Sequence, residues 1–274
     1  MPAISTNTAA NSAVRYLNIN SMQETSALSK LSSGSRITSA SDDAAGLAIS
    51  TRISSDITTL QQAATNAAQA TSILQTADGG ASNISDILAR MKSLASESAS
   101  GTVADSSRAY INSEFTQLKG EIDSIATGTR YSSQSLLDGS SVFSSGVAVL
   151  VGSTSADTIT ITLTNLTASS LGVTSLDVST QSGATSALTA LDSAIDTVSG
   201  ARASIGAQES RFNFSSDSIS TQTQNLQSAN SAIKDVDIAA EQATLSSAEV
   251  KTQAAVSAET AANQMPQYLL KLLG

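Results

Sequence analysis

The fold is decided by a stretch in the first half of the chain, residues 53–95, which reads ISSDITTLQQAATNAAQATSILQTADGGASNISDILARMKSLA. Apolar residues recur every seven positions in two series: Ile53, Leu60, Ala67, Leu74, Ala81, Leu88 and Ala95, and Ala63, Ala70, Ala77, Ile84 and Met91. Two such series form one apolar stripe along a helix, as in a coiled-coil seam. The stripe predicts a helix from about residue 44 to about residue 99, roughly 80 Å long.

Glycines and periodicity predict the other helices. Gly79 and Gly80 lie inside the long stripe, and because each glycine costs about 1 kcal/mol relative to alanine, we expect a kink or short break there. A second helix is predicted from about 104 to 126. Helical periodicity returns after Gly183 and continues nearly to the end of the chain, and the segment from about 3 to 31 is also helical in its spacing.

The middle of the chain has a different pattern. Residues 158–163, TITITL, alternate polar β-branched and apolar side chains, which predicts a strand with one buried face. The apolar run at 147–151 provides a partner, so we expect a hairpin within residues 142–176. The predicted fold is mainly α, a long helical rod or coiled coil of paired N- and C-terminal segments, with this small β-hairpin region at the far end of the rod.

Composition excludes many function classes. The 274 residues include no Cys and no His, so disulfides, thiol nucleophiles and Ser-His-Asp catalysis are impossible. The net charge of −9 leaves no basic face for nucleic acid. The uncharged stretch 57–77 is rich in Thr, Gln and Asn, so we interpret it as a packed helix and expect no membrane insertion. The pairs Asp42-Asp43 and Asp235 with Asp237 indicate helix caps rather than a site, and we expect no catalytic residue, cofactor or metal.

The terminal segments have unusually thin seams. In the C-terminal segment the seven-residue series are Ile233, Ala240, Ser247, Ala254 and Ala261, and Val236, Ala243, Val250, Ser257 and Gln264. Ordering a residue costs about 1–2 kcal/mol, whereas burial returns only about 25 cal/mol per Å² of apolar surface. We therefore hypothesise a subunit whose termini become ordered on polymerisation, the alternative being a monomeric bundle that folds its apolar tail, residues 268–273, into its own core. The expected assembly interface consists of Val14, Leu17, Leu28, Leu31, Ile233, Val236, Val250, Met265, Leu269, Leu270, Leu272 and Leu273.

Longer motifs carry a family resemblance. They are SKLSSGSRITSASDDAAGLAIS at 29–50, ARASIGAQESR at 201–211, SAIKDVDIAAE at 231–241 and AANQMPQ at 261–267. In this order the motifs resemble those of bacterial flagellins, over about residues 1–140 and 170–274. The resemblance implies a short flagellin that lacks the large outer domains.

The resemblance also implies a domain organisation. Residues 1–40 and 235–274 would form the two halves of an inner coiled-coil domain. Residues 41–140 would form the N-terminal helices of a rod domain, 141–176 the β-hairpin and variable middle, and 177–234 the C-terminal helix of the rod domain.

The function implied is that of a structural subunit of the bacterial flagellar filament, outside the cell, which polymerises with itself into a helical tube that acts as the motility propeller. The flagellar type III export apparatus would secrete it, and a secretion chaperone, the cap and the hook-associated proteins would be its partners. The alternatives are a hook–filament junction protein and a secreted rod-like adhesin. The match at residues 29–50 favours the filament.

Two immune-receptor epitopes are also implied. The segment 29–50 is similar to the epitope of a plant receptor, and a second patch is similar to that of an animal Toll-like receptor. Ser41 stands where many family members have Lys, and Ser93 stands where Glu is usual. The residues concerned are Ser33, Gly34, Arg36, Ile37, Asp42, Asp43, Gly46 and Leu47 in the first epitope, and Arg90, Leu94, Glu114 and Leu118 in the second.

Overall fold

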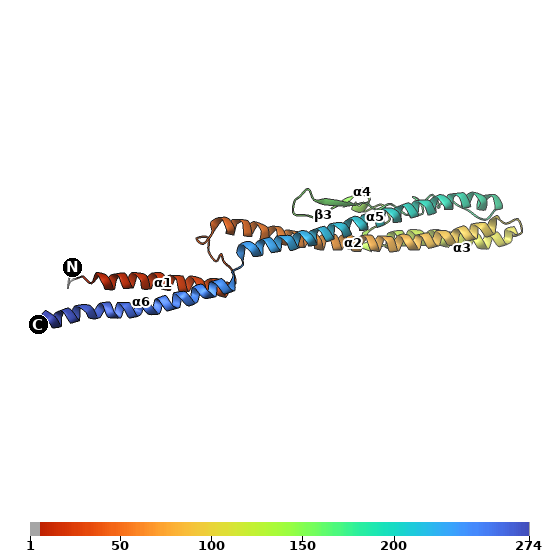
Figure 1. Ribbon diagram of the computed structural model, residues 1–274. Helices are drawn as coiled ribbons and strands as arrows, with labels where there is room; N and C mark the ends of the chain where they lie inside the picture. Colours follow the sequence, from red (N-terminus) through yellow and green to blue (C-terminus); the bar gives the residue numbers. More distant parts are fainter. Residues whose placement is uncertain (1–5, 274) are drawn as a thin grey trace. The chain divides into compact units, whose positions relative to one another are not determined.

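The computed structural model describes residues 6–273, and the side chains of residues 6–268. The helices are α1 (Thr8–Ser33), α2 (Ala44–Ala99), α3 (Asp105–Gly128), α4 (Val142–Ser145), α5 (Gln181–Lys234) and α6 (Ile238–Leu273), shown in Figure 1. Short antiparallel strands pair β1 (Arg130–Tyr131) with β2 (Gln134–Ser135) and β3 (Val147–Leu150) with β4 (Thr158–Ile161). The mainly α fold with a small β-hairpin region is confirmed.

The chain divides into two compact units. We call residues 1–55 and 225–274 the terminal unit, and residues 56–224 the central unit. Helices α2 and α5 contribute to both. Each unit has its own buried residues, so each is described by itself below.

Helix α2 has the bounds that its periodicity predicts. Every seam position from Leu60 to Ala95 in the two series is buried. The short break expected at Gly79 and Gly80 is absent, because α2 is continuous there. Packing against another segment requires glycine at position 80, because a Cβ there would lie 2.4 Å from Thr129 Oγ1. A Cβ at Gly79 would meet open space.

The core of the central unit lies between α2, α3 and α5. Phe115 and Ile122 of α3 and Phe212 of α5 are fully buried there. Arg108 of α3 is also buried, 5% exposed, and donates to the carbonyls of Ser98 and Ser100 at 2.8 Å each. It thereby satisfies carbonyl groups at the end of α2, which have no partners within the helix.

The β3–β4 hairpin is correctly predicted, but its position is not. Asn66 of α2 donates to the Leu150 carbonyl at 3.2 Å, and Gln208 of α5 both accepts from the Thr162 N–H (2.9 Å) and donates to its carbonyl (3.0 Å). The hairpin therefore lies beside the middle of α2 and α5 rather than at the far end, where α2 ends. There, Gln181 Nε2 bonds the Ala99 carbonyl. Side-chain amides hold the hairpin because they satisfy its outward-facing backbone groups.

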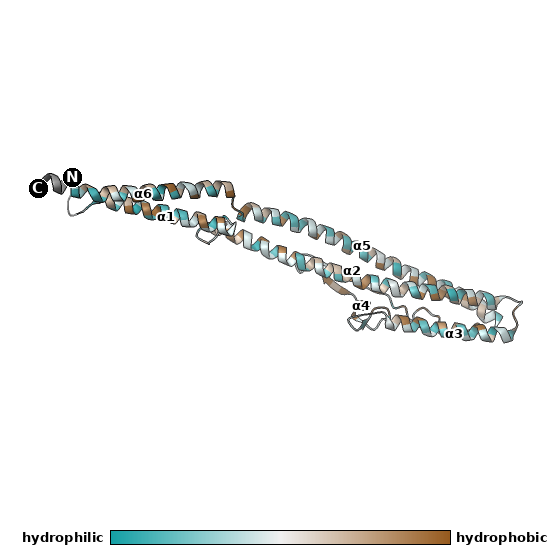
Figure 2. Ribbon diagram, turned by 90° about the horizontal axis from the view of Figure 1, so that it is seen from below, coloured by the Kyte–Doolittle hydropathy of each residue, from teal (hydrophilic) through white to brown (hydrophobic). Residues whose placement is uncertain are grey.

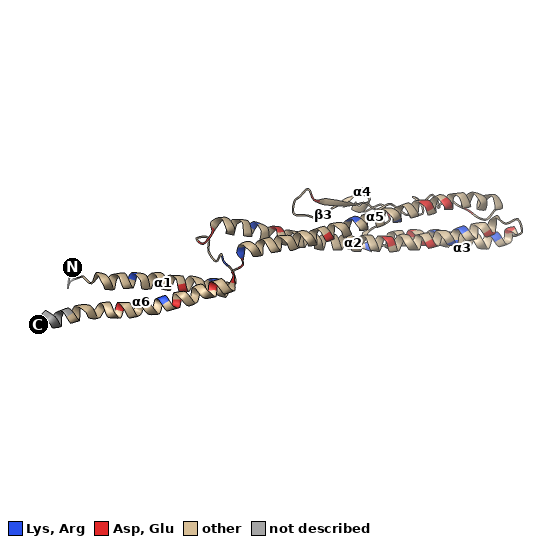
Figure 3. Cartoon of the chain, viewed as in Figure 1, with Lys and Arg blue, Asp and Glu red and all other residues tan. Residues whose placement is uncertain are grey.

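Charged side chains are sparse on α1, α2, α5 and α6 and more frequent on α3 (Figure 3). Hydrophilic and hydrophobic residues are interspersed along α1 and α6 (Figure 2). Among the described residues, no helix contains a stretch long and apolar enough to cross a membrane.

Candidate assembly surface

The terminal unit is built on the pairing of α1 with α6, which lie side by side and antiparallel (Figures 1 and 2). The positions that face the partner helix are spaced alternately three and four residues apart, as in a coiled coil. On α1 they are Ala10, Ala13, Leu17, Asn20, Glu24, Ala27 and Leu31, and on α6 they are Glu241, Leu245, Ala248, Thr252, Ala255, Glu259 and Ala262, all buried or half-buried.

The seam of α6 is not the one that the sequence suggests. The two predicted series are exposed from Ala240 to Gln264, and Val250 is 71% exposed. Helix α6 carries two stripes of small residues spaced by seven, on different faces. The stripe that faces α1 includes Leu245, which is 8% exposed and is the largest buried apolar side chain among the described residues of α6. A helix with two such stripes has one face left for another partner.

Large apolar side chains remain open on the described part of both helices. They are Val14, Tyr16, Met22 and Leu28 on α1, and Ile238, Val250, Val256, Met265 and Tyr268 on α6. Exposed apolar surface of this extent usually marks an association site.

The predicted interface residues fall into three groups. Val14, Leu28, Val250 and Met265 are exposed, whereas Leu17, Leu31, Ile233 and Val236 are half-buried within the terminal unit. The side chains of Leu269, Leu270, Leu272 and Leu273 lie outside the described residues.

Two short linkers are bonded to each other in this unit. The Arg36 N–H donates to the Lys234 carbonyl at 2.6 Å, and the Val236 N–H donates to the Gly34 carbonyl at 3.1 Å. The Arg36 guanidinium also donates to the Ile233 carbonyl at 2.8 Å, at the end of α5. Gly34 has a φ of +68°, which suits glycine at the C-cap of α1.

The loop that follows is held by its two aspartates. Asp42 accepts from the N–H and Oγ1 of Thr38 and from the N–H of Ser39, and these bonds lower the pKa of its carboxyl to about 2. Asp43 accepts from the Gly46 N–H at 2.8 Å in the first turn of α2. The interpretation of this pair as helix and turn caps is confirmed.

The residues that the family resemblance assigns to a plant-receptor epitope are only partly accessible. Ser33, Arg36 and Asp42 are exposed, Leu47 is half-buried, and Ile37 is 4% exposed. Gly46 is buried as well, where a Cβ would lie 2.8 Å from the Ile37 side chain.

The second patch lies on α2 and α3 of the central unit. Arg90 donates to Glu114 through Nε (3.0 Å) and Nη2 (2.7 Å), and both side chains are about half exposed. Leu118 is half-buried and Leu94 is 3% exposed, so Leu94 belongs to the core.

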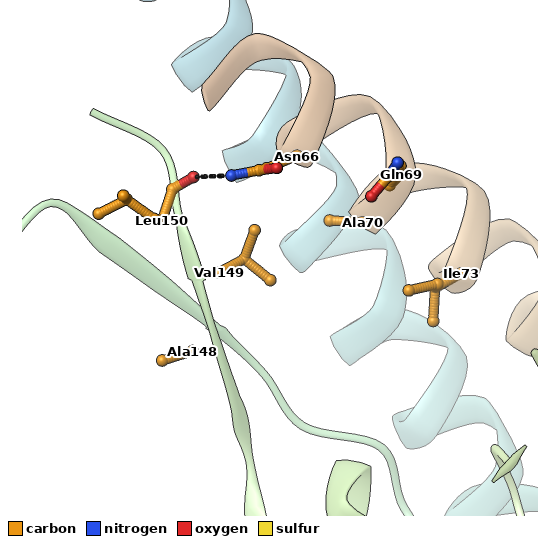
Figure 4. Close-up of a pocket in the computed structure, with 7 residues that line it drawn as sticks. All are labelled: Asn66, Gln69, Ala70, Ile73, Ala148, Val149 and Leu150. Carbon is orange, nitrogen blue, oxygen red and sulfur yellow. Dashed lines mark hydrogen bonds between the residues drawn. The ribbon is translucent and has the colours of Figure 1, made fainter. Parts of the chain in front are cut away.

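The central unit also has a shallow groove between α2 and β3. It has a volume of about 240 Å³ and is lined by Asn66, Gln69, Ala70, Ile73, Ala148, Val149 and Leu150 (Figure 4). The bond from Asn66 to the Leu150 carbonyl crosses it. The lining holds no ionisable side chain, so it offers no acid–base chemistry.

Within residues 6–273, no group of three or more acidic residues is placed to hold a metal ion. Two acidic residues, Asp78 and Glu209, lie close enough to interact electrostatically. Arg202 forms an ion pair with Asp78 at 2.9 Å, and burial together with the charge of Asp78 raises the pKa of Glu209.

These features define a class of protein: a helical subunit that pairs its two ends through small side chains and leaves apolar surface open for other copies. Residues 4–142 match the family model for the bacterial flagellin N-terminal helical region, and residues 188–273 match that for the flagellin C-terminal helical region. The chain belongs to the bacterial flagellin family.

Individual relatives support the family over the whole chain. A flagellin of Halalkalibacterium halodurans is 36% identical over 98% of this chain and 99% of its own length. A flagellar filament 30.7 kDa core protein of Treponema maltophilum is 33% identical over 94% of this chain and 95% of its own. This chain is accordingly a structural subunit of the bacterial flagellar filament, outside the cell.

Solved structures agree on the fold. The crystal structure of Bacillus cereus flagellin matches with a TM-score of 0.52 and 30% identity, over 61% of this chain and 94% of that one. A putative flagellar hook-associated protein from Vibrio parahaemolyticus matches with a TM-score of 0.58 over 71% of this chain and 100% of that one. At 16% identity this second match shows the fold alone.

Sequence reasoning missed the polar contacts of the terminal unit. Thr252 Oγ1 donates to Glu24, and Asn7 Nδ2 donates to the Ala262 carbonyl, across 228 and 255 residues of sequence. No local pattern marks such pairs. The polar residues at otherwise apolar seam positions are the one signal that could have indicated the contact between Glu24 and Thr252.

Proposed function

We propose that the α1–α6 pair forms the inner contacts between neighbouring copies of this chain in the filament. The observation that carries the proposal is the open apolar surface on both helices, which includes Val14, Leu28, Val250 and Met265. Burying a large apolar side chain contributes about 1.5–3 kcal/mol, so several such contacts per subunit give a stable polymer. Leu17, Leu31, Ile233 and Val236, with Leu269, Leu270, Leu272 and Leu273, complete the proposed interface.

The same pair is marginal in an isolated subunit. Its seam buries mostly alanine, and Leu245 is the one large apolar residue buried on α6 among the described side chains. That burial is small against an ordering cost of about 1–2 kcal/mol per residue. The terminal helices therefore gain most of their order when neighbouring copies cover their second faces.

The proposed boundaries follow from where the helices stop. The linkers at 34–43 and 235–237 separate α1 and α6 from α2 and α5. This supports an inner coiled-coil domain of residues 1–40 and 235–274, a rod domain whose helices lie within 41–140 and 177–234, and a β region at 141–176.

The remaining parts of the function rest on family membership. Export through the flagellar type III apparatus, with a secretion chaperone, and contacts with the cap and hook-associated proteins are consistent with a subunit whose ends order late. A role without enzymatic activity, cofactor, metal, nucleic acid or membrane insertion fits the absence of Cys and His and the charge of −9.

Receptor recognition would rest on the accessible residues of the two epitopes. On α2 and α3, Arg90 and Glu114 present an exposed ion pair, and half-buried Leu118 lies four residues further along α3. In the first epitope, Ser33, Arg36 and Asp42 present polar groups at the surface. Binding of purified receptor ectodomains to the monomer, with Arg90→Ala as the discriminating variant, tests this part.

Electron microscopy of purified protein with short filament seeds tests the assembly proposal. Long filaments, with helix content by circular dichroism rising on assembly, are expected. Val250→Ser and the double variant Leu269→Ser with Leu270→Ser should grow few filaments while the central unit stays folded. Ser246→Ala, at an exposed polar position on α6, is the matched control. Wild-type growth of both interface variants would contradict the proposed interface.

A hook–filament junction protein is the second candidate, favoured by the shared fold with the Vibrio hook-associated protein. Deletion of the gene separates the two roles. Loss of the filament along its whole length supports a filament subunit, whereas intact filaments that detach from the cell support a junction protein. A monomeric, fully helical chain that ignores seeds would support a secreted adhesin.

A further inference from the structure

Helix α6 contains a proline, Pro266, about two turns before its end. Proline has no backbone N–H, so it cannot donate the helical hydrogen bond to the carbonyl four residues earlier, which belongs to Ala262. Ala262 is 7% exposed, so this turn of α6 is largely shielded from water. A shielded carbonyl without a donor destabilises the folded state, so the proline creates a need for a donor from outside α6.

The donor comes from the opposite end of the chain. Asn7 lies immediately before α1, and its Nδ2 atom donates to the Ala262 carbonyl oxygen at 2.8 Å, a normal hydrogen-bond distance. The two residues are 255 positions apart in sequence. The start of α1 and the end of α6 lie together in the terminal unit (Figure 1), and there the Asn7 side chain replaces the bond that Pro266 removes.

The same side chain caps α1. Asn7 Oδ1 accepts from the Ala10 N–H at 3.1 Å, one of the N–H groups in the first turn of α1 that have no partner within the helix. An asparagine carries one acceptor and one donor group on the same short stem. An ionised aspartate has acceptors only, and the serine hydroxyl lies one bond closer to the backbone. Asn7 therefore satisfies an otherwise unpaired backbone group in each of the two helices.

The contact matters for assembly because of the residues that follow Pro266. A proline inside a helix bends it, so the direction of the residues beyond depends on how the freed carbonyl is held. Exposed Met265 and Tyr268 flank the proline, and α6 continues into the proposed interface residues of 269–273. The rest of the seam buries mostly alanine, so one bond to a shielded carbonyl is a substantial share of what holds the two ends together.

We propose that Asn7 is a positioning residue for assembly. Its amide pairs with the carbonyl that Pro266 leaves free, and so holds the end of α6 in the position from which it contacts neighbouring copies of the chain. The inference rests on the proposed role of the α1–α6 pair in assembly, and goes beyond it by assigning to Asn7 a role that helix capping does not require.

The test measures how readily the full chain assembles on filament seeds. The quantity is the critical concentration, which is the concentration of unassembled chain left in the supernatant after filaments at equilibrium are sedimented. Asn7→Asp and Asn7→Ser both retain an oxygen that can cap α1, and neither provides the amide donor for Ala262. One is charged and the other neutral, so a shared effect is not due to charge. Each should raise the critical concentration about tenfold, because the Ala262 carbonyl loses its donor.

The matched controls are the same two substitutions at Asn11, an exposed position one turn further into α1. Asn11→Asp and Asn11→Ser should keep the critical concentration within about twofold of the native value. If Asn7 acted only as a cap, Asn7→Asp and Asn7→Ser would behave like these controls, since asparagine, aspartate and serine cap helices about equally well.

A double-mutant cycle with Pro266→Ala tests the link to the proline. This substitution restores a backbone N–H at position 266, which can donate to the Ala262 carbonyl within α6. In the Pro266→Ala background, Asn7→Ser should raise the critical concentration by less than about twofold, so that the two substitutions are not additive. Capping of α1 does not depend on residue 266, so loss of the cap alone would give the same rise in both backgrounds.

The outcomes separate the two proposals. Failure of the native chain to elongate seeds contradicts the proposed function. If the native chain assembles, a native critical concentration for Asn7→Asp and Asn7→Ser overturns the inference about Asn7, as does an equal rise in the Asn11 controls. A rise of the same size for Asn7→Ser in both backgrounds also overturns it. Should Pro266→Ala not assemble, the comparison of positions 7 and 11 decides the inference alone.

Discussion

The neighbouring glycines of α2 allow a sharp test of how packing controls the central unit. Gly79 and Gly80 lie in the same helix, one residue apart, and the sequence gives no reason to treat them differently. Gly79 is exposed, and a Cβ added there meets open space. Gly79→Ala should therefore stabilise the chain by about 1 kcal/mol, the difference in helix propensity.

The same substitution at Gly80 should have the opposite sign. Its Cβ would lie 2.4 Å from Thr129 Oγ1 and 2.9 Å from both Thr129 Cγ2 and Leu137 Cδ1. Because both branches of Thr129 are too close, rotating its side chain gives no relief, and Thr129 Oγ1 also bonds the Ile125 carbonyl at the end of α3. Overpacking costs about 1–3 kcal/mol, so after the gain in propensity Gly80→Ala should be neutral or lose up to about 2 kcal/mol.

Thermal unfolding of the monomer by calorimetry and circular dichroism measures both changes. For a unit of this size 1 kcal/mol corresponds to about 2–4 °C in Tm, so Gly79→Ala should melt higher than the native chain and Gly80→Ala at or below it. Denaturant midpoints provide an independent check. A Gly80→Ala chain that melts as high as Gly79→Ala would refute the idea that Thr129 and Leu137 require glycine at position 80.

Further predictions concern single ionisable groups. Arg108→Ala should lower the free energy of unfolding by about 2–4 kcal/mol, measured by denaturant titration, because the buried Ser98 carbonyl loses its donor and the Ser100 carbonyl loses one of two. Burial and the charge of Asp78 raise the pKa of Glu209. The free energy of unfolding therefore falls as pH rises through that pKa and Glu209 ionises. At pH 7, Glu209→Gln should raise the free energy of unfolding by less than about 1 kcal/mol, and with it the Tm. At about pH 3 the substitution should change neither quantity. Asp42 has a pKa lowered to about 2, so its contribution is complete above its usual 3.8 and is lost as pH falls through 2, which carboxyl NMR shifts would follow.

The elements that depend on local pattern could be predicted from the sequence. The bounds of α2 and the β3–β4 hairpin follow from periods of about 3.6 and 2 residues, which act through neighbouring side chains. The continuity of α2 could not be predicted. Glycine at position 80 is required by close packing against Thr129, which is distant in sequence. The hairpin position depends likewise on Asn66 and Gln208, whose amides bond backbone groups far along the chain.

The sequence predicts the stripe of α6 that contains Val250, but it does not predict which face of α6 packs against α1. The expected series through Val250 is a true stripe of α6, yet it is the exposed one, and the stripe with Leu245 faces α1. Both stripes consist mainly of small residues spaced by seven, so periodicity alone has no basis for choosing between them. The choice depends on the partner helix and on contacts such as Glu24 with Thr252.

The two units differ in the size of the side chains that they bury, and this difference has a consequence for how variants behave. The central unit encloses Phe115 and Phe212 completely, whereas the α1–α6 seam encloses mostly alanine. Substitutions in the central core should therefore lower the Tm of the monomer, since each large side chain contributes about 3–5 kcal/mol when truncated to alanine. Substitutions on the open face of α6, such as Val250→Ser, remove no contact within the chain and should leave that Tm unchanged. Their cost should emerge only when copies meet, as a higher protein concentration required for filament growth.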